Sequence, residues 1–547
     1  MQLRLCRQAL CSALLALAAL HPAAAEEAAK PPSSPPAPSL HGDLSLSLGD
    51  AIRMGLENNL DVEVERYAPY IADRDETAAW GAYDPELFGE FTYSSTQEPN
   101  SLSLNFGVTE SEEYSPAGFG GLRGLLPLLG SGYELRLDSE RVDTNSSIQS
   151  PDPALRSSFL LSLTQPVLRN LFFNPEWTRV QTSRIASESA LDEFRRQVMD
   201  TVREIATNYW VLIANEEKRR VAEKSLETAR ALLGQTKTQF EVGVVSKVEV
   251  IEAEAGVAER EVNLIRAQNA YRSSQDDLID VVLGRHMAAG STLEIAPTDR
   301  PEDYVSYEID IEEAVRKAFV HRPELAAAQK RIAQGELELG LARNQQLPQL
   351  DLLVSYGNRG LAGAENKAAS CRFLTGAAQT ACLAAPASRT SYGETYDGFF
   401  TEDASEQFVA GARFSIPIPN TAPRATASKR ELELRRVRSE KTRLEQGILL
   451  EVRKSARDLA SAQEGIRAAE RRQAAAEEQL RAERIRLEYG EATPFEVLQR
   501  EEDLVEAESE KIDALRIYRV SATELDRAQG TILDTNHVVV EDVRALR

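Results

Sequence analysis

The sequence predicts a mixed α and β protein built from two tandem copies of one unit. Segments of the first half match segments of the second half in register, and each half combines short alternating stretches with a long heptad pattern. Composition agrees, because aromatic residues make up only 6% of the 547 residues while Ala, Glu, Arg and Leu crowd the second half. Such a composition is closer to long helices than to a compact enzyme core.

Charge and residue chemistry argue against two classes of function. The chain has 63 Lys and Arg against 86 Asp and Glu, a formal net charge of −23, and its sequence shows no clustered basic face of the kind that phosphate neutralisation requires. Its five histidines neither cluster nor show metal-ligand spacing, and its sequence holds no Gly-rich loop that would cradle a phosphate. We therefore expect no nucleic-acid partner, no cofactor, no bound metal and no enzymatic activity.

The N-terminus has the order of a secretory signal. Two arginines precede an apolar run over 9–20, and small residues lead to a cleavage site after Ala25. We expect residues 1–25 to be a signal peptide and 26–42 a Pro-rich linker. Beyond the signal, no stretch of the sequence approaches the roughly 20 consecutive apolar residues of a membrane-spanning helix. An exported chain of this kind is either soluble or inserted as a β-barrel.

Matched residues define the two repeats and their boundaries. Ala51 falls on Ala314 and, with the same offset, Pro85 falls on Pro348. The predicted divisions are 43–285 for the first repeat, 286–306 for an inter-repeat linker, 307–533 for the second repeat and 534–547 for a C-terminal tail.

Each repeat is expected to begin with a short amphipathic helix and a longer one. The longer helix ends before Pro85 in the first repeat and before Pro348 in the second, because the residue before a proline is pushed out of the helical region. A strand, a long loop and a return strand follow in each repeat.

The strands alternate apolar with polar residues. Alternation alone also fits half-buried strands of a soluble sandwich, but four strands cannot close a barrel within one chain and would leave exposed edges. Strands shared among several chains remove those edges and favour a membrane wall with lipid outside and water inside. The four alternating stretches are 87–93, 158–164, 350–356 and 408–415, and an aromatic cluster of Phe172, Phe173 and Trp177 after the second of them suits a membrane interface.

Two long loops join the strand pairs, over 94–157 and 357–407. Within the first loop, 133–141 alternates weakly and would fit an extra hairpin. Cys371 and Cys382 lie in the second loop of a chain expected to be exported, which favours a disulfide over a metal site.

Very long helical hairpins complete each repeat. No strong helix breaker interrupts 175–242, and apolar residues recur there at steps of three and four, as they do over 427–489. At 1.5 Å per residue, such helices extend about 100 Å. Gly243 and Gly490 supply left-handed caps at the hairpin turns, and a Ser or Thr begins each returning helix. The returning helices are expected to end near Leu283 and Gln529.

These segments resemble the paired repeats of the TolC family of outer-membrane efflux proteins. The resemblance covers about 44–533, and its most specific parts are the two matched tip motifs, FEVGVVSKVEVIEAE and LEYGEATPFEVLQRE. It implies a homotrimeric channel with four strands per chain, a shared 12-stranded β-barrel in the outer-membrane lipid and a long coiled-coil α-helical barrel in the periplasm. It also implies a partnership with a periplasmic adaptor (membrane fusion protein) and an inner-membrane pump, in tripartite efflux or type I secretion. The alternative is a soluble periplasmic coiled-coil scaffold or adaptor protein.

The resemblance also assigns roles at the hairpin tips. Acidic residues six and nine positions after the second tip glycine often form constricting rings, and here those positions hold Glu496 and Gln499, while Glu249 occupies the first-repeat position. A solvated hairpin face is the other interpretation of both glutamates. The arginine that commonly latches the gate is replaced by Ala492. The expected adaptor contacts are Gly243, Val244, Val245, Ser246, Gly490, Glu491, Ala492 and Thr493.

Overall fold

The computed structural model of the chain describes residues 41–99, 110–146, 149–284, 292–302, 309–385, 391–397, 399 and 405–541. The expected signal peptide and nearly all of the expected N-terminal linker lie outside these residues. The chain divides into two compact units, each drawn from both sequence repeats. The hairpin unit comprises Met1–Glu63, Val198–Ile309 and Ser455–Arg527, and the sheet unit comprises Val64–Gln197, Asp310–Lys454 and Ala528–Arg547.

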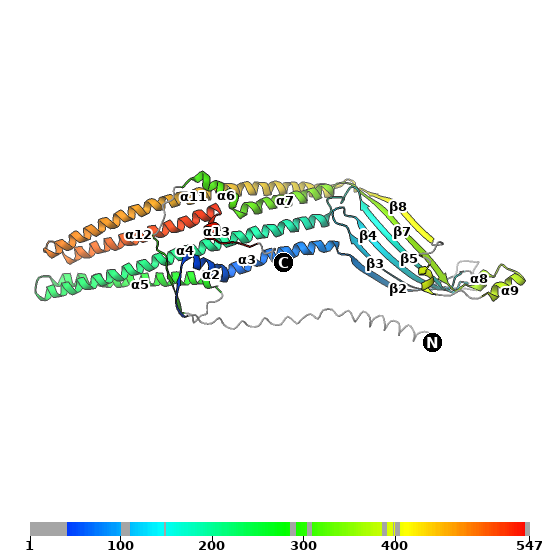
Figure 1. Ribbon diagram of the computed structural model, residues 1–547, viewed down its shortest axis with the longest axis horizontal. Coiled ribbons are helices and arrows are strands. Elements are labelled where there is room, and N and C mark those ends of the chain that lie inside the picture. The colour runs from blue at the N-terminus through cyan, green and yellow to red at the C-terminus, as the bar shows by residue number, and fades with distance from the viewer. Residues whose placement is uncertain are drawn as a thin grey trace. The chain divides into compact units, whose positions relative to one another are not determined.

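The hairpin unit consists mainly of helices. It contains α2 (Leu48–Asn58), α5 (Lys247–Leu283) and most of α12 (Pro494–Gln529), together with parts of α3 (Leu60–Trp80), α4 (Pro175–Glu241) and α11 (Thr421–Glu488). In Figure 1, α4 and α5 form one hairpin and α11 and α12 form the other. The long helices and the predicted ends at Leu283 and Gln529 are confirmed.

A small parallel sheet of β1 (His41–Leu46) and β6 (Thr292–Pro297) belongs to the same unit. β6 lies within the segment expected to be the inter-repeat linker. The sequence pattern does not reveal β6, because each strand of this pair has only six residues and its partner comes from a distant part of the chain.

Tyr209 ties this small sheet to the helices around it. Its ring is fully buried, and its hydroxyl donates to the Leu46 carbonyl at 3.0 Å and to Asp299 Oδ2 at 2.7 Å. The same Asp299 oxygen accepts the backbone N–H of Leu48 at 2.7 Å, at the start of α2. Burial raises the pKa of Tyr209, so this hydroxyl remains a donor.

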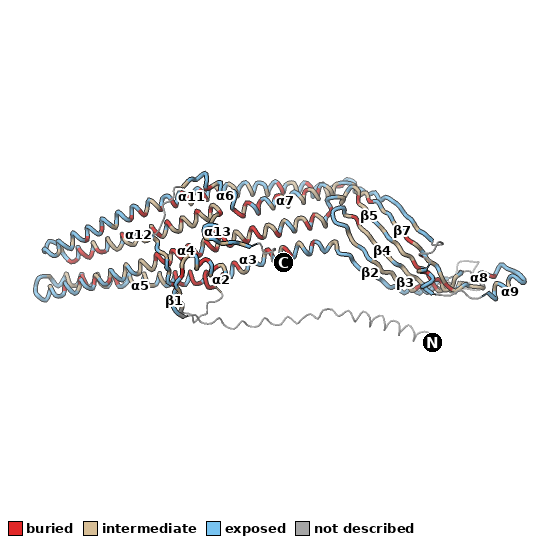
Figure 2. The backbone as a smooth tube through the Cα atoms, in the orientation of Figure 1, coloured by how far each residue is buried: buried red, intermediate tan, exposed pale blue. Residues whose placement is uncertain are grey.

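The sheet unit is organised around a six-stranded antiparallel sheet in the order β2-β3-β4-β5-β7-β8 (Figure 1). Figure 2 shows that these strands are mostly exposed or intermediate, whereas buried residues recur along the helices. The strands are β2 (Glu86–Pro99), β3 (Glu110–Leu125), β4 (Gly132–Thr144), β5 (Ala154–Pro166), β7 (Gln349–Gly363) and β8 (Ser405–Ser415). Its other elements include α6 (Ile311–His321), α7 (Pro323–Asn344), η1 (Gly81–Tyr83), α8 (Lys367–Ser370), α9 (Ala377–Ala384), α10 (Tyr392–Asp397) and α13 (Ile532–Thr535).

The strand number corrects the prediction of four strands per chain. The weak alternation over 133–141 corresponds to β4, which forms a hairpin with β3 between the two expected strands of the first repeat. Glycines mask β3 in the sequence because they have low strand propensity. They also permit the pairing: a Cβ added to Gly121 would lie 2.1 Å from the Leu135 carbonyl oxygen.

None of the helices in the described part of the chain is both long enough and apolar enough to cross a membrane.

Candidate functional site

The register of the sheet collects the alternating residues onto two distinct faces. Directly paired residues of antiparallel strands share a face. One row of direct partners, crossing all six strands, is entirely apolar: Leu87, Leu122, Leu135, Leu161, Tyr356 and Phe408. The row beside it, on the opposite face, is largely polar: Glu86, Arg123, Glu134, Ser162, Ser355 and Val409.

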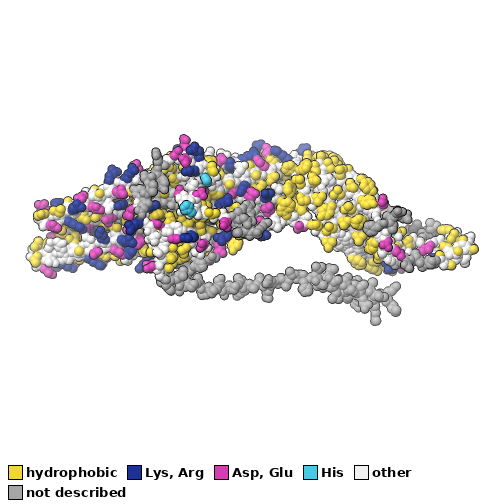
Figure 3. All heavy atoms as spheres, in the orientation of Figure 1, with side chains coloured by type: hydrophobic (Ala, Val, Ile, Leu, Met, Phe, Trp, Pro, Cys, Tyr) yellow, Lys and Arg dark blue, Asp and Glu magenta, His cyan; other side chains and the backbone are white. Residues whose placement is uncertain are grey.

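The apolar face is exposed in the single chain. Leu87 is 83% exposed, Phe408 67% and Tyr356 45%, and hydrophobic side chains gather over the strands in Figure 3. A soluble monomer rarely leaves such a large contiguous apolar surface in water, so this face has the character of a surface that contacts lipid or protein.

Ion pairs and polar contacts cross the strands on the opposite face. Arg123 on β3 makes a two-pronged contact with Glu86 on β2, at 2.7 Å and 3.0 Å. The Arg136 guanidinium on β4 lies 4.0 Å from the centre of the Phe119 ring on β3, and Ser158 on β5 donates to Asp138 on β4 at 3.2 Å. The chemistry of this face suits water.

α10 covers part of the apolar face near Ser157, at the opposite end of β5 from the one that leads into α4. The Thr395 and Ser157 hydroxyl oxygens lie 2.6 Å apart, and those of Tyr396 and Ser139 lie 2.8 Å apart. Ser139 and Ser157 are direct partners in the sheet. This polar row therefore marks where the apolar surface stops and α10 begins.

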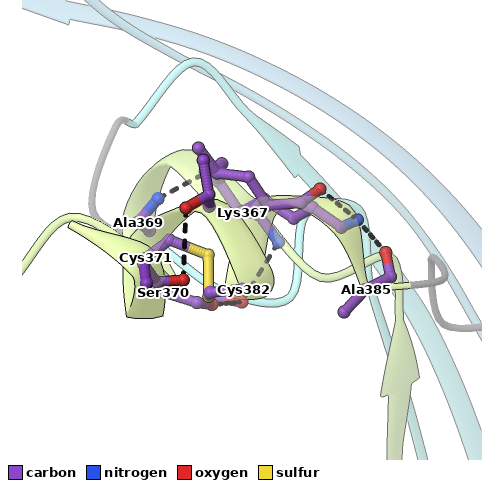
Figure 4. The surroundings of a disulfide bond; sticks show 11 residues. Lys367, Ala369, Ser370, Cys371, Cys382 and Ala385 are labelled. Carbon is purple, nitrogen blue, oxygen red and sulfur yellow. Dashed lines mark hydrogen bonds between the residues drawn. A yellow bond between two sulfur atoms is a disulfide. The ribbon is translucent and has the colours of Figure 1, made fainter. Parts of the chain in front are cut away.

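A disulfide joins Cys371, just after α8, to Cys382 in α9, with their Cα atoms 5.8 Å apart. Figure 4 shows Lys367 beside it, with its ammonium reaching the end of α9; that ammonium donates to the Leu383 carbonyl at 3.0 Å. The bond closes a short loop in the segment between β7 and β8.

In the hairpin unit, both tips end in the same helix-capping motif. Gly243 (φ 80°) and Gly490 (φ 74°) adopt left-handed conformations. The N–H of Val244 donates to the Gln239 carbonyl and that of Gly243 to the Phe240 carbonyl, both at 2.9 Å. Glu491 and Gly490 repeat this pair of bonds at the second tip, so both turns are Schellman motifs.

The predicted gate glutamates help to start the returning helices. Glu249 and Ser246 form a capping box at the start of α5. Thr493 donates to Glu496 Oε2 from its backbone N–H at 2.7 Å and from its hydroxyl at 3.1 Å, and the Glu496 N–H donates back at 3.3 Å. These hydrogen bonds from Thr493 lower the pKa of Glu496.

Both tips carry exposed apolar side chains. Val242 is 71% exposed, Val244 73%, Tyr489 79% and Phe495 53%. Among the other predicted tip residues, Ser246, Glu491, Thr493 and Gln499 are exposed and Val245 and Ala492 are intermediate. An apolar surface at the end of a hairpin offers a contact to another protein.

Behind the tips, Arg260, which the sequence pattern does not single out, connects the two hairpins. Arg260 on α5 is buried, and its guanidinium donates to the Leu498 carbonyl on α12 at 2.9 Å. A Cβ added to Gly256 would approach the Leu498 side chain at 3.1 Å. The signal available in the sequence was this small residue one turn before an arginine, which is too common a pattern to interpret alone.

The predicted interfacial aromatics occupy different surroundings within the sheet unit. Trp177 packs edge-on against Trp80, with ring centres 5.9 Å apart. Phe172 is 55% exposed and Phe173 42%, and the Phe173 ring lies against Gly340 of α7.

An antiparallel sheet with one exposed apolar face and two long helical hairpins are the features expected of a TolC-type outer-membrane channel. The family model for outer membrane efflux proteins matches residues 123–282 and 314–531, so the chain belongs to this family. This match confirms the predicted resemblance to the TolC family of outer-membrane efflux proteins.

Solved channel structures share the fold. The CmeC outer membrane channel of Campylobacter jejuni is 12% identical over 89% of this chain and 86% of that chain, with a TM-score of 0.58. The outer membrane protein VceC of Vibrio cholerae is 14% identical over 88% and 96%, with a TM-score of 0.59. CusC is 15% identical over 88% and 92%, with a TM-score of 0.60. No curated protein matches the chain.

Proposed function

We propose that the protein is a homotrimeric export channel of the outer membrane that extends into the periplasm. In this proposal it is a passive conduit of a tripartite efflux or type I secretion system, gated at its periplasmic tips. The carrying observation is the unbroken apolar row across the six strands, opposite a polar row. Outer-membrane lipid would cover the apolar face, and water would fill the side lined by the polar face.

The proposal also gives roles to the N-terminal segment and to the two repeats. Residues 1–25 would direct secretion, and the repeats over 43–285 and 307–533 would each supply one hairpin. Three chains would then present six hairpin tips. Phe172 and Phe173, both substantially exposed, would lie at a membrane interface together with Trp177.

The hairpin tips would contact a periplasmic adaptor, which in turn receives substrate from an inner-membrane pump. The exposed Val244 and Tyr489 side chains support this assignment, because they flank the two tip glycines with apolar surface. The test is a photo-crosslinking residue at Val244, in cells that also express the adaptor and pump encoded beside this protein. A crosslink to that adaptor is expected. The same residue at Val320 of α6, which is 77% exposed, is the matched control, and equal crosslinking at both positions would contradict tip docking.

The gate would use Glu496, with Glu249 and Gln499 as further pore-lining candidates. Glu496→Gln separates the two roles of this residue, because glutamine also serves at the third position of a capping box while carrying no charge. A carboxylate ring in a narrow passage favours cations. The expected result in planar bilayers is therefore a reversal potential that moves toward zero in a KCl gradient.

The wild-type protein tests the channel itself. Purified trimer added to a planar bilayer should give discrete conductance steps, and a protein that stays soluble without detergent and never conducts would overturn the proposal. If Glu496→Gln conducts with unchanged ion selectivity, Glu496 does not line the pore, whereas the channel proposal stands.

A further inference from the structure

Both edges of the six-stranded sheet are long and unpaired in the single chain. In the described part of the chain, β2 pairs only with β3, and β8 pairs only with β7. β2 has 14 residues and β8 has 11, nearly all of them exposed. Natural proteins rarely leave such edges open, because their free N–H and C=O groups recruit another strand.

We propose that β8 of one chain pairs with β2 of the next, so that three chains close an 18-stranded wall instead of the 12-stranded one expected from four strands per chain. The inference rests on the proposed homotrimer. It commits to a second copy of this chain as the partner of each edge.

Strand direction and face both permit this junction. All neighbouring strands of the sheet are antiparallel, and their number is even, so β2 and a neighbour's β8 meet antiparallel. The apolar face carries Leu87 and Tyr93 on one edge and Phe408 and Phe414 on the other. Direct pairing of β2 with β8 can therefore continue both faces across the junction without a break.

The observed stagger of the strands restricts the junction to two registers, and side-chain pairing chooses between them. Glu86, the first residue of β2, lies in the same row as Val409, and β8 continues six residues farther to Ser415. If Glu86 of the next chain pairs with Ser415, each chain shifts the register by six residues, or about 20 Å along the strands. The six strands of one chain are about 29 Å wide. These two lengths correspond to a tilt of about 35°, within the range for closed barrels. Pairing Glu86 with Arg413 instead gives about 25°, which lies below that range, whereas pairing Phe88 with Ser415 gives about 43°, within it. That last register places Phe414 opposite Gly89 and Phe408 opposite Ser95, so it forfeits the apolar cross-strand pairs.

Side chains in the selected register are complementary. Leu87 lies opposite Phe414 and Tyr93 opposite Phe408 on the apolar face. On the polar face Arg413 lies opposite Phe88 and diagonal to the carboxylates of Glu86 and Glu90. Cross-strand and diagonal neighbours of this kind stabilise antiparallel pairs.

The β3–β4 hairpin is a full part of the wall. β3 pairs with β2 from Glu86↔Arg123 to Pro99↔Glu110, and β4 pairs with β5 from Gly132↔Thr164 to Val142↔Ala154. At about 4.8 Å between strands and a tilt of about 35°, 18 strands enclose about 34 Å between opposite backbones, against about 22 Å for 12 strands.

The junction is tested by cysteine crosslinking of the purified full-length protein in detergent. The variant Tyr93→Cys with Phe408→Cys should form, on oxidation, a covalently closed trimer that reduction dissolves, because direct antiparallel partners fall within disulfide reach. The matched control is Tyr93→Cys with Gln407→Cys, whose side chains point to opposite faces and should not link. Equal linking of both pairs, or no linking of the first pair in a trimer, would overturn the register.

Strand number is counted by electron cryomicroscopy of the same trimer. Eighteen strands in cross-section are expected, and a trimer with 12 strands in its wall would overturn the inference while leaving the proposed function intact. If native mass measurement shows no trimer, the proposed function itself fails, so the two failures are distinguishable.

Discussion

Alanine at the tip glycines isolates the cost of a left-handed backbone. Gly243 has a φ of 80°, and no heavy atom lies within 4 Å of a Cβ added there. Steric collision with neighbours therefore contributes nothing, and Gly243→Ala should cost only the intrinsic penalty of about 1–2 kcal/mol for an L-residue in this conformation. Because 1–2 kcal/mol corresponds to a factor of about 5–30 in an opening equilibrium, the Schellman bonds of the tip should open more often by that factor.

Hydrogen exchange, measured by mass spectrometry on the detergent-solubilised protein, reports how often the hydrogen bonds of the tip open. The amide of Val244, which donates to Gln239 at 2.9 Å, should lose protection by the stated factor. Gly234 is the matched control, because it too has no heavy atom within 4 Å of an added Cβ but lies inside α4 with an ordinary φ. Gly234→Ala should stabilise its helix by about 0.5–1 kcal/mol. If both variants change protection in the same direction, the assigned role of the left-handed glycine is wrong.

Three further predictions concern the side-chain contacts. Tyr209→Phe removes a buried donor to the Asp299 carboxylate and should cost about 1.5–3 kcal/mol, seen as faster hydrogen exchange in β1 while exchange at the tips is unchanged. Lys330→Met removes the ammonium 2.8 Å from the Asp192 carboxylate, which is only 6% exposed and keeps Arg195 at 3.7 Å; it should therefore cost less than the roughly 3–5 kcal/mol of an uncompensated buried charge, and adding Asp192→Leu should recover most of the loss, as measured by protease resistance of the sheet unit. Because the pKa of Glu496 lies below the ordinary value of 4.5, its ionised form should stabilise the tip fully above pH 4.5 and progressively less as the pH falls below it; Glu496→Gln should abolish this pH dependence of tip protection.

The hairpin tips were largely predictable from the sequence. A glycine, then Ser246 or Thr493 three residues later, then Glu249 or Glu496 three residues after that, encodes a helix stop and a helix start through hydrogen bonds between near neighbours. In the structure these carboxylates fold back onto the cap, which is a different role from lining a gate ring or lying on a solvated hairpin face.

The hairpin-to-hairpin contact was not predictable in this way. The Arg260 guanidinium meets a carbonyl on a helix more than 200 residues away, and an arginine on a heptad pattern is ordinarily expected in water. Only the close approach of α12 at Gly256 makes this buried position possible.

The sequence by itself determined where the chain turns, which residues alternate and how the two repeats correspond, because each of these depends on residues a few positions apart. Tertiary structure decided the number of strands and the pairing of β1 with β6. β3 is rich in glycine and has little preference for a strand of its own, and it becomes one through the ladders that β2 and β4 offer on its two sides. Hydrogen bonds between segments remote in the chain, which local preference does not encode, therefore set the width of the sheet.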